Sequence, residues 1–188
     1  MKEKDLKALI SKSIYAVATE DVRPILKGVK LEVSGDTITA VALDGYRLAV
    51  RTCKIDNITN DAKVIIPGKT LSDINSLLSS EEDVKLGFDE KNAIFIIDGT
   101  KITTRLLEGD FIDYKKLLPR EYNSKVKLKT KELLNSIERA SLLSQSEKNN
   151  LIVYCEFDDG KIAAEIGDLV VLDLQIAARD GAQDVADF

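Results

Sequence analysis

Hydrophobic residues recur along the chain in a pattern that repeats about every 60 residues. Three segments carry apolar residues three and four positions apart, the spacing that places them on one face of an α-helix. The positions are Leu6, Leu9, Ile10, Ile14 and Val17, then Leu71, Ile74, Leu77 and Leu78, then Leu133, Leu134, Ile137 and Ala140. The pattern predicts three amphipathic helices, each with a buried face.

Short alternating runs separated by turn residues follow each helix, which is typical of a three-stranded antiparallel meander. The expected strands are 29–33, 37–42 and 48–55, then 84–88, 93–97 and 101–107, then 151–157, 161–166 and 169–176. Further strands are expected at 63–67 and 125–128, before the second and third helices. The unit is therefore β-α-β-β-β, an α+β fold with helices packed on antiparallel sheets, and its first copy lacks the leading strand.

Composition indicates an ordinary globular protein, with 44% hydrophobic and 31% charged residues. No segment approaches the roughly 18 apolar residues of a membrane helix, and the first residues lack the hydrophobic stretch of a signal peptide. We therefore expect a cytoplasmic protein with no membrane contact. In that compartment Cys53 and Cys155 are expected to be reduced and buried rather than joined in a disulfide.

The residues available for chemistry argue against an enzyme. The chain contains no histidine, so the commonest general base and metal ligand are both missing. A site built from Asp44, Asp113 and Tyr46 would need carboxylates from different loops, and no phosphate loop, metal-ligand cluster or nucleophile motif accompanies them. We expect no catalytic residue, no metal site and no cofactor.

The charge pattern permits nucleic-acid binding without requiring it. The net charge of −5 disfavours general attraction to phosphates, although a local basic stripe can bind DNA on an acidic protein. Lys4, Lys7 and Lys12 lie on the polar side of the first helix, together with Asp5. A solvated charged face is the simpler explanation of these residues.

Two segments depart from the repeat. Within residues 41–50, an Asp44-Gly45 turn presents an aromatic residue and an arginine between two apolar strands. Residues 107–119 join the second copy to the third and are more apolar than an ordinary linker.

These segments resemble the bacterial sliding clamp family, the β subunit of the replicative DNA polymerase III. Residues 44–50, Asp-Gly-Tyr-Arg-Leu-Ala-Val, are similar to that family's Asp-Gly-His-Arg-Leu-Ala-Val turn. Residues 108–114, Glu-Gly-Asp-Phe-Ile-Asp-Tyr, are similar to its linker, and residues 21–28 and 138–144 also fit. The resemblance covers about residues 4–170, with four motifs in the same order.

The resemblance implies the DNA-clamp fold, in which two subunits of three similar domains form a ring around duplex DNA. It assigns residues 1–122 to the middle domain, without its first strand, and residues 123–188 to part of the C-terminal domain, with a divergent tail. The chain would be an excised fragment or a natural short form. Free strand edges predict self-association, whereas ring formation and oligomeric state stay open.

The resemblance also implies a groove, between the middle and last domains, that binds short peptides of DNA polymerase and other partners. The matching positions are Leu26, Leu43, Gly45, Tyr46, Arg47, Leu48, Ile112, Lys116 and Leu117. This set suits an extended peptide with a glutamine and two hydrophobic anchors. Leu43 stands where threonine is common and Ile112 where proline is usual, and both keep the groove apolar. By spacing alone, the leucines and Ile112 could equally be ordinary core.

Helices of the family line the ring and contact DNA phosphates rather than bases. The matching positions are Lys7, Arg23, Lys69 and Arg139, and helix geometry adds Lys12. The leading hypothesis is a processivity factor, or a fragment of one, that tethers polymerase and repair proteins to duplex DNA and is served by a clamp loader. The alternative is a shortened clamp-like protein that binds clamp-interacting peptides without encircling DNA.

The end of the chain matches the family least. Residues 177–188 are small and acidic, which favours a disordered tail. Alternatively, Gln183 and Phe188 would dock in a neighbour's groove, because the last six residues loosely resemble a clamp-binding peptide.

Overall fold

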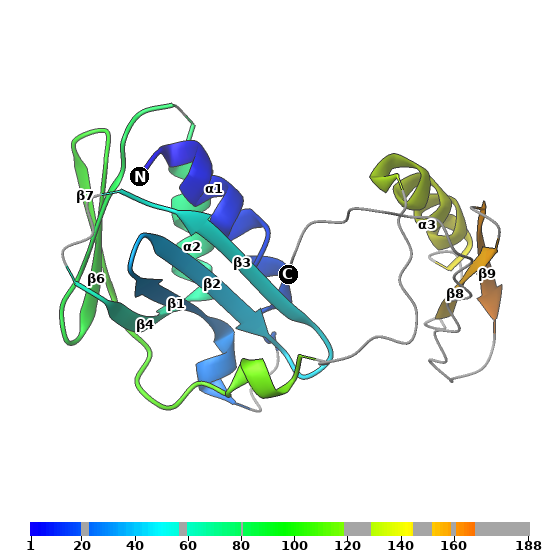
Figure 1. Ribbon diagram of the computed structural model, residues 1–188, viewed down its shortest axis with the longest axis horizontal. Helices are drawn as coiled ribbons and strands as arrows, with labels where there is room; N and C mark the ends of the chain where they lie inside the picture. The colour runs from blue at the N-terminus through cyan, green and yellow to red at the C-terminus, as the bar shows by residue number, and fades with distance from the viewer. Residues whose placement is uncertain are drawn as a thin grey trace. The chain divides into compact units, whose positions relative to one another are not determined.

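The chain folds into two compact units, Met1–Leu117 and Leu118–Phe188, which are described separately. The computed structural model (Figure 1) describes residues 1–19, 23–56, 60–79, 81–118, 129–144, 152–158 and 161–167, with side chains up to Arg139.

Two antiparallel sheets form the first unit, with strand orders β3-β2-β1-β4 and β5-β6-β7. The helices are α1 (Glu3–Ser11) and α2 (Gly68–Leu77), with 3₁₀ turns η1 (Ile14–Ala16), η2 (Pro24–Lys27) and η3 (Tyr114–Lys116). The strands are β1 (Gly28–Ser34), β2 (Thr37–Leu43), β3 (Leu48–Lys54), β4 (Ala62–Pro67), β5 (Lys85–Phe88), β6 (Asn92–Ile97) and β7 (Thr100–Arg105). The seven strands predicted within this unit are confirmed, as is the α+β class.

The main core lies where α1 and α2, side by side, cover one face of the four-stranded sheet (Figure 1). Strand β1 contributes Val29, Leu31 and Val33, because alternate side chains of a strand point to the same face. Phe95 of β6 is fully buried in the same core. Residues of both sheets and both helices therefore share one hydrophobic interior.

The residues before α1 pair with the start of the second sheet. The Met1 amino group donates to the Val84 carbonyl at 3.1 Å, and the Val84 N–H donates to the Met1 carbonyl at 2.9 Å. An antiparallel bridge joins Lys2 and Asp83. Strand β4 likewise precedes α2 and pairs with β1. In each copy of the repeat, therefore, the residues that precede the helix pair with the start of the meander of the other copy.

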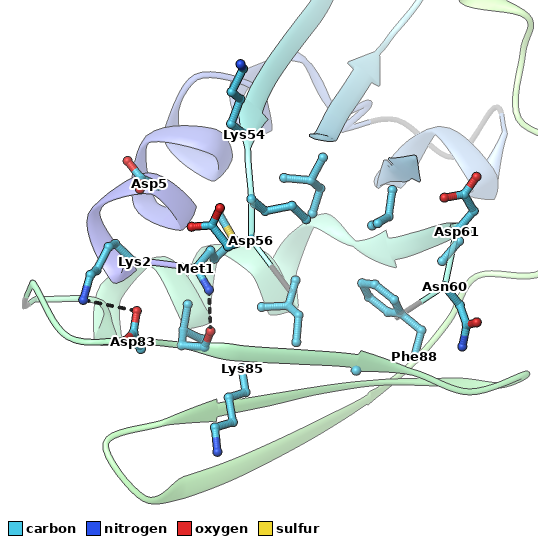
Figure 2. Close-up of a pocket in the computed structure, with 17 residues that line it drawn as sticks. Met1, Lys2, Asp5, Lys54, Asp56, Asn60, Asp61, Asp83, Lys85 and Phe88 are labelled. Carbon is cyan, nitrogen blue, oxygen red and sulfur yellow. Dashed lines mark hydrogen bonds and ion pairs between the residues drawn. The ribbon is translucent and has the colours of Figure 1, made fainter. Parts of the chain in front are cut away.

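An open pocket of about 900 Å³ lies beside β5. Figure 2 shows Lys2 and Asp83 at one end of this pocket and Asn60, Asp61 and Phe88 at the other. None of the residues predicted to bind peptide lines it. The pocket is therefore distinct from the predicted groove.

Two helix predictions in this unit are wrong in detail. The first helix ends at Ser11 rather than reaching Val17. The Ser13 hydroxyl donates to the carbonyls of Leu9 and Ile10, at 2.8 and 3.2 Å, and a 3₁₀ turn follows. The Ser13 side chain thus bonds the last carbonyls of the helix, at the point where the chain leaves the α-helix for the 3₁₀ turn. In the second helix Leu77 is 54% exposed rather than buried.

The second unit contains α3 (Thr130–Ser144), which packs against a hairpin of β8 (Ile152–Asp158) and β9 (Lys161–Gly167). The predicted strands at 125–128 and 169–176, and the tail residues 177–188 with Gln183 and Phe188, lie outside the described residues. Leu134 and Ile137 are exposed, contrary to the prediction that their whole stripe is buried.

Candidate functional site

A second apolar cluster lies on the face of the four-stranded sheet opposite the helices. It comprises buried Leu26, Val41, Leu43 and Tyr114 and partly buried Ala18, Ile25, Leu48, Val50, Phe111 and Ile112; we call it the linker-face cluster. Strand β2 is apolar on both faces, since Ala40 and Ala42 belong to the main core while Val41 and Leu43 belong to this cluster. Such a strand needs a cover on each side.

The cover is the linker after β7, residues 106–117. The Leu107 N–H donates to the Ile65 carbonyl of β4 at 2.8 Å. At Gly28 of β1, an added Cβ would lie 2.7 Å from the Leu107 side chain and 2.9 Å from the Ile66 carbonyl oxygen. A side chain at position 28 would therefore force the Leu107 side chain and the β4 backbone at Ile66 to shift, which favours glycine there.

The linker is also tied to the sheet by a polar network. Tyr114 donates its hydroxyl to Glu32 at 2.9 Å, and Glu32 pairs with Lys30 at 2.7 Å. The Lys30 ammonium lies 5.7 Å from the Phe111 ring centroid and 5.8 Å from that of Tyr114, within cation–π range. All four side chains belong to β1 or to the linker.

These contacts explain two pKa shifts. Burial alone would raise the pKa of Glu32, but the hydrogen bonds from Lys30 and Tyr114 outweigh it and hold that pKa below its ordinary value. Burial, and then the hydrogen bond to Glu32, raises the pKa of Tyr114 to about 12. Glu32 is therefore ionised and Tyr114 protonated around neutral pH, as the hydrogen bond requires.

Residues 44–47 form a four-residue loop between β2 and β3, whose last pair is Leu43 with Leu48. Asp44 organises the loop: its Oδ1 accepts the N–H groups of Tyr46 and Arg47 at 2.9 and 2.8 Å. Its Oδ2 accepts the Arg47 Nε and Nη2 at 2.9 and 2.6 Å. Gly45 has φ +98°, a conformation that glycine adopts without strain. The sequence predicted the turn and its outward aromatic, but not this carboxylate cap.

The cap holds Tyr46 with its side chain 99% exposed, beside the strand ends that carry Leu43 and Leu48. An exposed aromatic next to an apolar cluster is typical of a binding surface. The Arg47 guanidinium is half-exposed and already oriented by Asp44. The loop therefore presents one aromatic and one cationic group without further ordering.

The loop should keep its structure in acid until close to pH 2. The two backbone N–H bonds, and then the Arg47 side chain, lower the pKa of Asp44 from 3.8 to about 2. A depressed carboxyl pKa stabilises the fold above pH 3.8, and this stabilisation disappears as pH falls through about 2. The NMR shifts of the Tyr46 and Arg47 amides should titrate with a midpoint near pH 2, and Asp44→Asn should abolish that titration. A midpoint near pH 4 would contradict the cap.

The structure brings part of the predicted peptide site together. Leu26, Leu43, Leu48 and Ile112 share the linker-face cluster, with Leu26 and Leu43 buried and the other two partly buried. Gly45, Tyr46 and Arg47 form the adjoining loop. Leu117 is exposed at the end of the linker, and Lys116 pairs with Asp113 at 3.2 Å. Peptide binding by these residues stays a prediction.

The cations predicted to face DNA are exposed, on separate elements. Lys7 lies on α1, Lys12 directly after it, and Lys69 on α2. The Lys7 amino group donates to the Leu78 carbonyl after α2, at 2.6 Å, which ties the two helices together. Arg23 precedes η2, and Arg139 lies on α3 in the second unit, 3.3 Å from the Ser136 hydroxyl. Their contact with DNA stays a prediction.

Sequence reasoning missed Lys30, Glu32, Phe111 and Tyr114. The signal for Phe111 and Tyr114 was present, because both belong to the apolar linker segment. The charged pair on β1 gave no signal, since alternating charges on a strand ordinarily mean a solvent-exposed face.

Other kinds of site have little support in the described part of the chain. There, no three His, Cys, Asp or Glu side chains gather as metal ligands would. Among the same residues, no helix is long and apolar enough to cross a membrane. Cys53 is a free, half-buried thiol, and burial raises its pKa. The side chain of Cys155 lies outside the described set.

Known proteins resemble the chain in both sequence and fold. Residues 1–113 match the family described as DNA polymerase III beta subunit, central domain. The beta sliding clamp of Staphylococcus aureus is 35% identical over 157 residues, which are 83% of this chain and 42% of that protein. The DNA polymerase sliding clamp of Bacillus subtilis is 29% identical, with a TM-score of 0.77, over 88% of this chain and 47% of that one. The DNA polymerase III beta chain of Streptococcus pneumoniae is 30% identical, with a TM-score of 0.76, over 87% of this chain and 44% of that one.

These matches support the resemblance seen at the turn and the linker. The chain spans less than half the length of these relatives. The matched family region covers nearly all of the unit that carries the linker-face cluster. On this evidence the chain belongs to the DNA polymerase III beta subunit family, the bacterial sliding clamps.

Proposed function

We propose that this chain is a peptide-binding module of a sliding clamp, a non-catalytic processivity factor that tethers polymerase and repair proteins to duplex DNA. The observation that carries the proposal is the linker-face cluster, half-covered at Leu48 and Ile112 and flanked by the exposed Tyr46 and Arg47. The family relationship supports it, since the relatives are clamps.

The chemistry of the surface suits an extended apolar peptide with a polar handle. Leu48 and Ile112 would accept hydrophobic anchors, each contributing about 1.5–3 kcal/mol on full burial. The Tyr46 ring would pack on the peptide, and Arg47 would bond a peptide carbonyl or side-chain amide. Because Asp44 already fixes Arg47, binding would order few additional rotamers.

The DNA-facing role is part of the same proposal. The exposed Lys12 and Lys69 would meet phosphates through long-range attraction that carries no sequence information. Arg23 and Arg139 are candidates for the same role. With a net charge of −5, the chain should hold DNA weakly and lose it as salt rises, as a sliding contact requires. Self-association and a clamp loader are further proposed partners.

Binding measurements on the full chain test the proposal. A labelled glutamine-containing peptide with two apolar anchors should bind at least tenfold tighter than its scrambled sequence. A labelled DNA duplex should bind weakly, with affinity falling linearly in log–log plots against salt concentration. Peptide binding without duplex binding would favour the alternative, a clamp-like protein that captures peptides without encircling DNA. Failure to bind the peptide would contradict the proposal.

A further inference from the structure

We infer that Glu32 and Lys30 are positioning residues for peptide binding: they latch the linker onto the sheet and so fix Ile112 at the binding surface. The last step of this inference rests on the proposed function, whereas the latch itself does not. Tyr114 and Phe111 are the linker side of the latch.

The sheet side of the latch is rigid. Lys30 and Glu32 lie on β1, which is paired on both edges, with β2 and with β4. Their side chains are each only 17% exposed and form a 2.7 Å ion pair. Removing an ion pair from water costs desolvation free energy. That cost is offset only when the carboxylate and the ammonium also interact with further partners. Here the Tyr114 hydroxyl uses the second Glu32 oxygen, while Lys30 uses the two aromatic rings.

The linker side needs such a tie. Residues 106–113 form neither helix nor strand, and the backbone bond of Leu107 to Ile65 fixes only the start of the segment. Phe111 and Tyr114 flank Ile112 on both sides in sequence, and both reach Lys30. Holding these two rings therefore determines where Ile112 stands relative to Leu43 and Leu48, the strand residues of the same cluster.

The two parts of the surface thus depend on different ties. Asp44 fixes the loop that carries Tyr46 and Arg47, and Glu32 fixes the linker that carries Ile112. Releasing the latch should loosen one wall and leave the other in place. Peptide affinity should then fall without loss of the fold.

Substitutions at both ends of the hydrogen bond test the inference. Tyr114→Phe removes only the hydroxyl, Glu32→Ala removes the acceptor, and Glu32→Gln keeps an oxygen that can accept the phenol proton. The matched control is Thr39→Val, because Thr39 lies directly across from Glu32 on β2 and its hydroxyl bonds Thr52 rather than the linker.

Two readouts separate the latch from the binding. Hydrogen exchange of the amides in residues 106–117 should speed up in Tyr114→Phe and Glu32→Ala and stay near wild type in Thr39→Val. Glu32→Gln should give a smaller increase than Glu32→Ala, because it keeps the acceptor for Tyr114 but loses the ion pair with Lys30. The dissociation constant of the glutamine-containing peptide should rise about three- to tenfold in the first two variants only. Exchange of the main-core strands should not change.

Each alternative result has a definite meaning. Unchanged linker exchange in Tyr114→Phe would overturn the latch. Faster exchange with unchanged peptide affinity would overturn the positioning role. If the wild-type chain binds no peptide, the proposed function and the positioning role both fall, and faster linker exchange in Tyr114→Phe would still support the latch.

Discussion

Replacing Phe95 with alanine should lower the free energy of unfolding of the first unit by about 3–5 kcal/mol. The Phe95 side chain is fully buried in the main core, to which residues of both helices and both sheets contribute. Its removal loses the transfer free energy of an aromatic ring and leaves a cavity that a shared, close-packed core fills only in part. Urea unfolding followed by circular dichroism measures the change.

A neighbouring residue on the same strand provides the control. Ile96 follows Phe95 on β6, points to the opposite face and is 38% exposed. Ile96→Ala should therefore cost less than about 1 kcal/mol. Equal losses for the two variants would mean that the two faces of the second sheet are equally buried, which would contradict the described core.

Strand β1 shows what the sequence determines well. Its alternation of apolar and polar residues predicted the strand, because successive side chains of a strand point in opposite directions, and its apolar residues Val29, Leu31 and Val33 all belong to the main core. Residues 93–97 are all apolar, so the sequence predicted a strand there without indicating that Phe95 rather than Ile96 would be buried. Strand existence follows from local pattern, and the structure confirms it.

Helix faces were predicted less accurately, for a geometric reason. At 100° per residue, Leu71, Ile74 and Leu78 fall within about 60° of one another, whereas Leu77 lies about 120° from Leu71. The prediction placed Leu77 on the buried face only because it is apolar, although its angular position lies at the edge of that face. The exposure of Leu77 follows directly from the helical angle.

The candidate site required long-range information that local pattern does not contain. The run Val41, Ala42, Leu43 indicates a strand covered on both faces, but nothing near it identifies the cover. The cover is the linker around Tyr114, 82 residues along the chain from its partner Glu32. The resemblance to the clamp family connected the turn with the linker, while the polar network between β1 and the linker became visible only in the fold.

Replacing Leu48 with aspartate should weaken peptide binding at least tenfold. Leu48 is partly buried in the linker-face cluster, at the first position of β3 after the loop that carries Tyr46. A carboxylate there removes an apolar contact of about 1.5–3 kcal/mol and must be desolvated when an apolar anchor docks. Because 1.4 kcal/mol corresponds to a factor of ten, the lost contact alone accounts for the expected change. Titration of the labelled peptide measures the effect.

The same charge placed farther along β3 separates binding from folding. Thr52 shares the face of Leu48 on β3 but is exposed, where it bonds Thr39. Thr52→Asp should leave peptide affinity within about twofold of wild type, since a solvated carboxylate on an exposed strand position costs little. Leu48→Asp should keep the circular dichroism spectrum of the wild type, because the main core on the other face of the sheet is untouched. If a folded Leu48→Asp bound the peptide as tightly as the wild type, the linker-face cluster would be a second hydrophobic core and not a binding surface.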